Sequence, residues 1–231
     1  MEARVIELRN LRKTFHLNGS HTVVADNINA VFPDRTCVAV LGRNGAGKSS
    51  LLQMLAGTLD YDSGEIVSTG SISWPVGFAG SCHPELTGVQ NVRFVARVYG
   101  VETDDLVEFV RDFAELGEHF NLPVRSYSSG MKSRLAFGMS MGIKFDTYLV
   151  DEVTAVGDAS FKAKGERLFT DRLRNSSAIM VTHGLGQVKR LCQHAAVLED
   201  GHLYYYTDPQ EAIRHHQELM KSPPPDKNRA R

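Results

Sequence analysis

A phosphate-binding pattern lies at residues 42 to 49, where the chain reads Gly-Arg-Asn-Gly-Ala-Gly-Lys-Ser. The pattern G-x-x-x-x-G-K-[ST] binds nucleotide phosphates because its glycines let backbone N–H groups turn inward around the phosphate oxygens. Lys48 would reach the terminal phosphates, and the Ser49 hydroxyl would ligate Mg²⁺. The residues expected around the phosphates are Gly42, Asn44, Gly45, Ala46, Gly47, Lys48, Ser49 and Ser50. We therefore predict a nucleoside triphosphate site; a Gly-rich turn without a ligand is the alternative.

Two adjacent acids, Asp151 and Glu152, end a second apolar run that begins at Thr147. Adjacent carboxylates at a strand end are costly unless a cation or a proton relieves their repulsion. Asp151 is therefore expected to help hold Mg²⁺, and Glu152 is the candidate general base or water-positioning group. A solvated strand end is the alternative interpretation, and the phosphate-binding loop upstream disfavours it.

Short apolar runs that alternate with helical patterns must position these groups. This alternation favours strands joined by crossover helices, and so an α/β fold with a mostly parallel sheet. The clearest predicted strands are Thr36 to Leu41, Thr147 to Asp151, Ala178 to Thr182 and Ala195 to Glu199. Ligands gather at the carboxyl ends of strands in such sheets, so the chemistry is expected at that edge.

Two further regions are predicted beside the main sheet. Met1 to Val31, with a loop at Asn18 to Ser20, indicates antiparallel strands, and Gly64 to Trp74 indicates another antiparallel pair in the same β layer. Between Thr87 and Ile143 the apolar residues recur at helical spacing, which predicts a helical insertion. Its expected helices are Val89 to Tyr99, Asp104 to Leu116 and Ser129 to Ile143, and a last helix is expected near Pro209 to Met220.

One large domain, residues 1–220, accounts for these elements, with a helical subdomain at about 87–143. The proline run after Ser222 ends the last helix, and we expect a disordered tail over 221–231. At 231 residues and 42% hydrophobic composition, the chain can form a sizeable core.

The composition also limits the function classes. The 26 basic and 27 acidic residues lack the basic excess of a dedicated nucleic-acid binder. No stretch approaches the roughly 18 consecutive apolar residues of a membrane span, and the first ten residues do not form a signal-peptide core. The cysteines Cys37, Cys82 and Cys192 have no spacing typical of disulfide frameworks or zinc sites, so we expect reduced thiols.

The order of these parts resembles the nucleotide-binding subunit of ATP-binding cassette (ABC) transporters. Between the phosphate-binding loop and the acid pair, Ser128-Ser129-Gly130 stands where that family has a signature loop, usually Leu-Ser-Gly-Gly-Gln. The resemblance implies ATP and Mg²⁺ as ligands and a head-to-tail homodimer, in which this loop binds the γ-phosphate held by the other subunit. A serine turn that opens a helix can bind an anion, but such a turn is also a common helix cap.

Three other segments match the family residue by residue. His183, after the predicted strand that ends at Thr182, is similar to the switch histidine that senses the γ-phosphate. Phe15 lies where the family has an aromatic ring that stacks on adenine, with a core phenylalanine as the alternative. Ala155 to Asp158 occupies the D-loop, where Asp158 could bridge the two subunits.

The chain also departs from the common family pattern. The loop from Trp74 to Pro84 lacks the glutamine that usually touches Mg²⁺ and the attacking water, and Gln90 lies too far downstream to replace it. Ser129 and Met131 replace a glycine and a glutamine of the signature. The combination of Tyr-Ser-Ser-Gly-Met at 127–131, Ala-Val-Gly-Asp at 155–158 and His-Pro-Glu-Leu-Thr-Gly at 83–88 nevertheless resembles the branch that exports capsular polysaccharides. An ATPase of a teichoic-acid or O-antigen exporter is the alternative within the family.

Membership of that branch implies an integral membrane permease as partner, docked near Phe78 to Tyr99, unless that segment is ordinary core. It further implies periplasmic and outer-membrane export components reached through the permease, and a peripheral location on the cytoplasmic face of the inner membrane. No nucleic-acid partner is expected. The alternatives are a soluble ABC ATPase acting on nucleic acid or ribosomes, a P-loop kinase or GTPase, and a catalytically silent assembly module.

Overall fold

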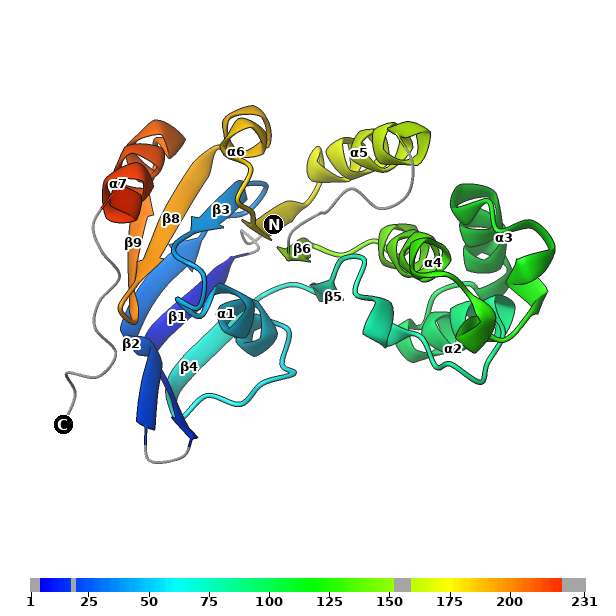
Figure 1. Cartoon of the computed structure of the whole chain (residues 1–231), viewed down its shortest axis with the longest axis horizontal. Coiled ribbons are helices and arrows are strands. Elements are labelled where there is room, and N and C mark those ends of the chain that lie inside the picture. The colour runs from blue at the N-terminus through cyan, green and yellow to red at the C-terminus, as the bar shows by residue number, and fades with distance from the viewer. Residues whose placement is uncertain (1–4, 18–19, 152–158, 222–231) are drawn as a thin grey trace.

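The computed structural model describes residues 5–17, 20–151 and 159–221. Its main sheet has six strands in the order β5-β6-β7-β3-β8-β9, and all but the edge strand β9 run parallel (Figure 1). The strands are β5 (Ile72–Pro75), β6 (Thr147–Asp151), β7 (Ser177–Val181), β3 (Cys37–Leu41), β8 (His194–Glu199) and β9 (His202–Tyr206). The predicted α/β fold with a mostly parallel core is confirmed.

The four central strands of this sheet, β6, β7, β3 and β8, are buried on both faces, and they are apolar at successive positions. In β3, Val38 and Val40 join the core shared with a second sheet, whereas Cys37, Ala39 and Leu41 join the core shared with the helices. A strand covered on both faces reads as a continuous apolar run, which is why these strands were visible in the sequence.

The second sheet is antiparallel, with three strands in the order β2-β1-β4. These are β1 (Ile6–Leu17), β2 (Ser20–Phe32) and β4 (Ser63–Ser68). Helix α1 (Lys48–Leu55) contributes Leu51, Leu52 and Met54 to the core that this sheet shares with the parallel sheet. The antiparallel pair predicted around residues 18–20 is confirmed for the described residues of that hairpin.

The second predicted hairpin, Gly64 to Trp74, is wrong. Its first half, β4, pairs with β1, but its second half, β5, pairs in parallel with β6 in the other sheet. The reason lies in a long-range contact at the start of β5: the backbone N–H and hydroxyl of Ser71 both donate to Asp146 Oδ2 at 2.8 Å. Asp146 directly precedes β6 and so fixes β5 beside it.

The helical insertion contains three α-helices, α2 (Gly88–Tyr99), α3 (Thr103–Ala114) and α4 (Ser129–Gly142), which lie beyond the β5 edge of the sheet (Figure 1). Each agrees closely with a predicted helix. Short 3₁₀ turns lie at Ala79–Ser81, Gly117–Asn121 and Val124–Ser126. Phe113 of α3 stacks on Phe137 of α4, with ring centroids 5.6 Å apart. Phe113 also contacts Phe161 of α5 (Ala159–Leu173), with ring centroids 5.1 Å apart. The insertion is thereby attached to the rest of the protein through aromatic packing.

The remaining helices follow the strands of the parallel sheet. They are α5 (Ala159–Leu173), α6 (Leu185–Leu191) and α7 (Pro209–Lys221). Helix α7 packs against β3, β8, β9 and α6, with Ala212 and Ile213 fully buried. Among the described residues, no helix combines the length and apolar character needed to cross a membrane.

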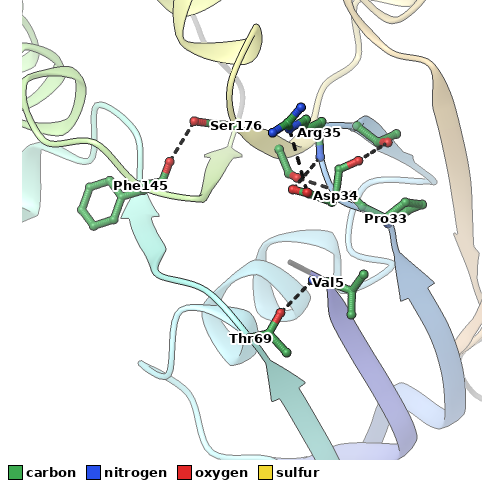
Figure 2. Close-up of polar contacts among 9 residues, drawn as sticks. Val5, Pro33, Asp34, Arg35, Thr69, Phe145 and Ser176 are labelled. Carbon is green, nitrogen blue, oxygen red and sulfur yellow. Dashed lines mark hydrogen bonds and ion pairs between the residues drawn. The ribbon is translucent and has the colours of Figure 1, made fainter. Parts of the chain in front are cut away.

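Polar contacts connect the segments that lead into the parallel strands (Figure 2). The hydroxyl of Ser176, before β7, donates to the carbonyl of Phe145, before β6, at 2.9 Å. The hydroxyl of Ser177 donates to the carbonyl of Pro33, before β3, at 3.4 Å. These bonds lie at the amino ends of the strands and leave the carboxyl ends for ligands.

Two of the three cysteines, predicted to be reduced, lie side by side. Cys37 Sγ and Cys192 Sγ are 3.3 Å apart in the buried core, too far for a disulfide bond, and Cys82 lies elsewhere as a third free thiol. The hydrogen bond between the two thiols and the burial raise the pKa of the Cys37 thiol. Sequence spacing gave no sign of this pair, because the two residues are brought together by β3 and the end of α6.

Candidate nucleotide-binding site

A cavity of about 680 Å³ opens at the carboxyl edge of the parallel sheet. This volume is in the range of small-molecule sites. Its lining comes from β1, β2, the β3–α1 loop, α1, β6, β7 and the segment after β7, which are far apart in the sequence. The lining residues are Phe15, Thr22, Val24, Asn44, Gly45, Gly47, Lys48, Ser49, Ser50, Asp151, Val181 and His183. The fold thus brings most of the predicted site residues around one space.

The loop between β3 and α1 can follow this path only with glycine at two positions. Gly42 has φ +148°, and a β-carbon on it would lie 2.4 Å from the carbonyl oxygen of Leu198 in β8. Gly47, the residue before α1, has φ +100°, and a β-carbon there would lie 2.4 Å from Val24 Cγ1. The loop is therefore held between β8 and β2, and its glycines are required for close approach. Gly42 and Ala46 belong to the loop without lining the cavity.

Lys48 is buried, and its ammonium group is held by the loop itself. Its Nζ donates to the carbonyl oxygens of Gly42 at 2.9 Å and Arg43 at 2.8 Å. These carbonyls stabilise a charge that would otherwise be costly inside the protein. The side chain starts at the first residue of α1, where the helix N-terminus favours anions, so the cation and the helix end act on the same ligand.

The opposite wall of the cavity comes from the antiparallel sheet. Phe15 of β1 is 38% exposed and belongs to neither buried core, which argues against the alternative of a core phenylalanine. Thr22 and Val24 of β2 lie beside it, and Phe15 pairs with Thr22 across the strands. Sequence analysis did not identify Thr22 and Val24. Their same-face spacing was a usable signal, but only once the register of the hairpin was known.

Two predicted metal ligands face the same cavity. Ser49 comes from the first turn of α1, and Asp151 is the last residue of β6. Glu152, the candidate base, and the D-loop at Ala155 to Asp158 lie outside the described residues. The chain thus places the hydroxyl and the carboxylate together, and the role of Glu152 stays a prediction.

His183 is exposed at the cavity, two residues after the end of β7. The turn that carries it is fixed by Thr182, whose hydroxyl accepts the backbone N–H of Gly184 and lies 3.0 Å from Gln187 Oε1. This position allows the imidazole to approach a terminal phosphate in the cavity, as the predicted switch histidine would.

The predicted signature residues do not line the cavity of their own chain. Ser128 caps α4, accepting a hydrogen bond from Met131 N at 3.2 Å, and both Ser128 and Ser129 are exposed, with Gly130 beside them. Tyr127 fixes the turn, because it is buried and its hydroxyl donates to the carbonyl of His119 at 2.6 Å. The start of α4 is therefore exposed to solvent, where a second molecule could meet it.

Gln90 has a structural position rather than a place at the cavity. Its side-chain oxygen accepts the backbone N–H of Thr87 at 2.9 Å, and its own N–H donates to the Thr87 hydroxyl at 3.1 Å. This reciprocal pair is a capping box at the start of α2. In agreement with the sequence analysis, Gln90 is not in a position to act as the missing glutamine.

Comparison with known proteins agrees with this arrangement. The family model described as ABC transporter matches residues 25–155. The chain is similar to the polysialic acid transport ATP-binding protein KpsT of Escherichia coli, with 48% identity over 90% of this chain and 95% of KpsT. It is also similar to the ATP-binding protein BexA of Haemophilus influenzae, with 40% identity over 94% of this chain and all (100%) of BexA.

The fold is shared with solved structures of ABC proteins. One is the dimeric post-hydrolysis state of the ATP-binding cassette MJ0796 bound to ADP and Pi, with a TM-score of 0.73 and 21% identity. That match covers 86% of this chain and 96% of the other. At this identity the likeness concerns the fold alone.

Proposed function

The chain belongs to the ABC transporter family, and on this premise we propose that it is the ATP-binding and ATP-hydrolysing subunit of a capsular polysaccharide exporter. The extent of the match to KpsT and BexA supports this, because nearly the whole of each relative is covered. The single observation that carries the proposal is the cavity in which Lys48, Ser49, Asp151 and His183 meet. Residues 1–220 would form one ATPase domain with a helical subdomain at about 87–143.

ATP would lie in this cavity with its phosphates on the loop before α1 and its adenine against Phe15. The N–H groups of the loop and the helix N-terminus would bind the phosphates, and Lys48 would leave its two carbonyl partners to reach the terminal ones. Gly42, Asn44, Gly45, Ala46, Gly47 and Ser50 complete this phosphate site.

Ser49 and Asp151 fit Mg²⁺, because they offer a hydroxyl and a carboxylate oxygen at one cavity, and this ion is usually bound by few protein ligands plus substrate phosphates. When bound, Mg²⁺ would neutralise charge on the phosphate oxygens. Glu152 would orient the attacking water and accept its proton while the bond between the γ-phosphorus and the bridging oxygen breaks. ADP and inorganic phosphate are then the products, and His183 would report loss of the γ-phosphate.

Two copies of the chain would complete each other's sites. Ser128 and Ser129 are exposed at the start of α4, Gly130 is half-buried beside them, and none of the three lines the cavity of its own chain. In a head-to-tail homodimer they would bind the nucleotide of the partner subunit. ATP then shifts the dimer from open to closed because the closed form binds it more tightly. Because the usual glutamine is missing, the chain could bind ATP without hydrolysing it. A failure to release phosphate would identify it as a catalytically silent module.

The partner would be an integral membrane permease docked on α2. Phe94 and Val98 lie one turn apart on this helix and are 61% and 60% exposed, so this part of the segment is not core. Arg93 and Arg97 lie next to them, so we propose a cytoplasmic permease segment with apolar and acidic side chains as the occupant. The chain would then sit on the cytoplasmic face of the inner membrane, and would act on periplasmic and outer-membrane export components through the permease.

The proposal is tested by reconstituting the chain with its permease in vesicles and measuring phosphate release and glycolipid-linked polysaccharide transport. We expect ATP-dependent transport that Lys48→Ala abolishes. Phosphate transfer to a small acceptor instead of water would indicate a kinase, and salt-sensitive nucleic-acid binding without transport would indicate a soluble ABC ATPase. Either result would refute the proposal. For the docking surface, Phe94→Ser with Val98→Ser should prevent copurification with the permease, as should removal of charge at Arg93 and Arg97.

A further inference from the structure

The last helix of the chain reaches the phosphate-binding loop. The guanidinium of Arg43, the second residue of the loop, donates from Nη2 to the backbone carbonyl oxygen of Leu219 near the end of α7. The two residues are 176 positions apart in the sequence, and the packing of α7 on β3 and β8 brings them together. Arg43 therefore acts as a cationic cap for the carboxyl end of α7, where the helix dipole favours positive charge.

A continuous chain of hydrogen bonds joins α7 to the phosphate-binding lysine. Lys48 Nζ donates to the carbonyl oxygen of Arg43 at 2.8 Å, and the side chain of the same Arg43 donates to Leu219. Lys48 is also the residue that we propose binds the terminal phosphates. Arg43 therefore contacts the phosphate-binding lysine through its backbone carbonyl and α7 through its side chain.

His216, one turn before Leu219, faces the same region. It is only 8% exposed, and its Nδ1 has no hydrogen-bond partner among the described residues. Burial lowers the pKa of His216, and the nearby cationic groups of Lys48 and Arg43 lower it further. The lowered pKa favours the neutral form of the imidazole beside the loop.

We propose that α7 is a positioning element of the nucleotide site, and that Arg43 transmits the position of α7 to the phosphate-binding loop. The inference rests on the proposed function, because it concerns the affinity of the proposed ATP site. Arg43 acts on the loop backbone and not on the γ-phosphate. ATP and ADP should therefore depend on it equally, and the KM for ATP should change more than kcat.

The experiment measures equilibrium binding of fluorescent ATP and ADP analogues, together with KM and kcat, for the full chain and its variants. Arg43→Ala should weaken both nucleotides about tenfold, the size expected for loss of one hydrogen bond from a charged group. Arg43→Lys, which can still donate to the carbonyl, should restore most of the affinity. Arg174→Ala, at an exposed position in the α5–β7 turn, is the matched control and should bind nucleotide like the unaltered chain.

A second pair of variants changes the hydrogen-bond acceptor, the carbonyl of Leu219, instead of the donor, Arg43. Met220→Pro disfavours helical geometry at Leu219 and so displaces its carbonyl, whereas Met220→Ala leaves the helix intact. Met220→Pro should weaken binding as much as Arg43→Ala, and the double variant should be no weaker than either, because both break the same link. Unaltered nucleotide affinity in Arg43→Ala, or additive losses of affinity in the double variant, would overturn this inference and leave the proposed function standing. No nucleotide binding by the unaltered chain would overturn the proposed function together with it.

Discussion

Gly47 lies so close to Val24 that a β-carbon on the glycine would stand 2.4 Å from Val24 Cγ1. The contact joins the phosphate-binding loop to the antiparallel sheet, so the two walls of the cavity are fixed relative to each other. Val24 is itself buried in the core beneath the antiparallel sheet, so it cannot move towards that sheet to make room. A side chain at position 47 must therefore displace the loop.

Gly47→Ala should lower ATP affinity by at least about tenfold, since strain at φ +100° adds to the clash. Isothermal titration of ATP measures the effect. Gly57→Ala is the matched control: it also has positive φ, at +68°, but nothing lies within 4 Å of its added β-carbon. It should cost about 1 kcal/mol of stability and leave ATP affinity unchanged. Equal affinities for the two variants would show that the loop tolerates the clash.

Lys48→Ala should reduce steady-state phosphate release on the order of a hundredfold, because a buried cation aimed at the developing charge is removed. A coupled phosphate assay measures turnover. Lys144→Ala removes an exposed lysine between α4 and β6 and should leave turnover unchanged. A Lys48→Ala variant that hydrolyses ATP like the unaltered chain would place the phosphate site elsewhere.

Glu152→Gln should bind ATP but hydrolyse it slowly, because an amide cannot accept the proton of the attacking water. Closed dimers should then accumulate, and light scattering with ATP and with ADP would detect them. Hydrolysis at the normal rate would assign another role to Glu152. A strictly monomeric, ATP-loaded variant, with the permease present, would contradict the dimer proposal.

Ser128→Ala should cost about 1 kcal/mol of stability through loss of the cap on α4. Thr87→Ala removes the equivalent cap on α2 and provides a control of similar structural cost. If Ser128 also binds the partner's nucleotide, its variant should lose far more ATPase activity than Thr87→Ala at the same thermal stability. Equal losses of ATPase activity in both variants would show that Ser128 acts only as a helix cap.

The lowered pKa of His216 predicts that the stability of the protein depends on pH. Its pKa is lowered from 6.5 in the folded protein, so the unfolded chain binds a proton more readily. The free energy of unfolding should therefore fall as the pH drops below about 6.5 and towards the folded-state pKa. Thermal unfolding between pH 8 and pH 5 should show a smaller fall in Tm for His216→Gln than for the unaltered chain. His119→Gln, at an exposed position, controls for the loss of one histidine.

Local patterns in the sequence predicted the parts of the site that are local. The strand before the phosphate loop is a continuous apolar run, and the loop itself is a short motif, so Lys48, Ser49 and Asp151 could be placed at one sheet edge. The helices of the insertion were predicted to within a few residues, because their apolar spacing and capping residues lie within each helix.

Contacts between distant segments were beyond such patterns. The four-residue strand β5 has no alternation that identifies its partner, and the bonds from Ser71 to Asp146 decide its sheet. The approach of Leu219 to Arg43 depends on how α7 packs across β3 and β8. Residue spacing in the sequence predicts neither contact. The contact between the last helix and the phosphate-binding loop is therefore visible only in the folded structure.

The central position of β3 in its sheet affects how fast its amide hydrogens exchange with solvent. β3 is hydrogen-bonded on one side to β7 and on the other to β8, and is buried on both faces, so its amide hydrogens should exchange with solvent only through global unfolding. The start of α4 has exposed serines and should exchange through local fraying. The phosphate-binding loop therefore follows the strand that is expected to exchange most slowly, whereas the start of α4, which we propose binds the nucleotide of a second copy, is expected to exchange faster.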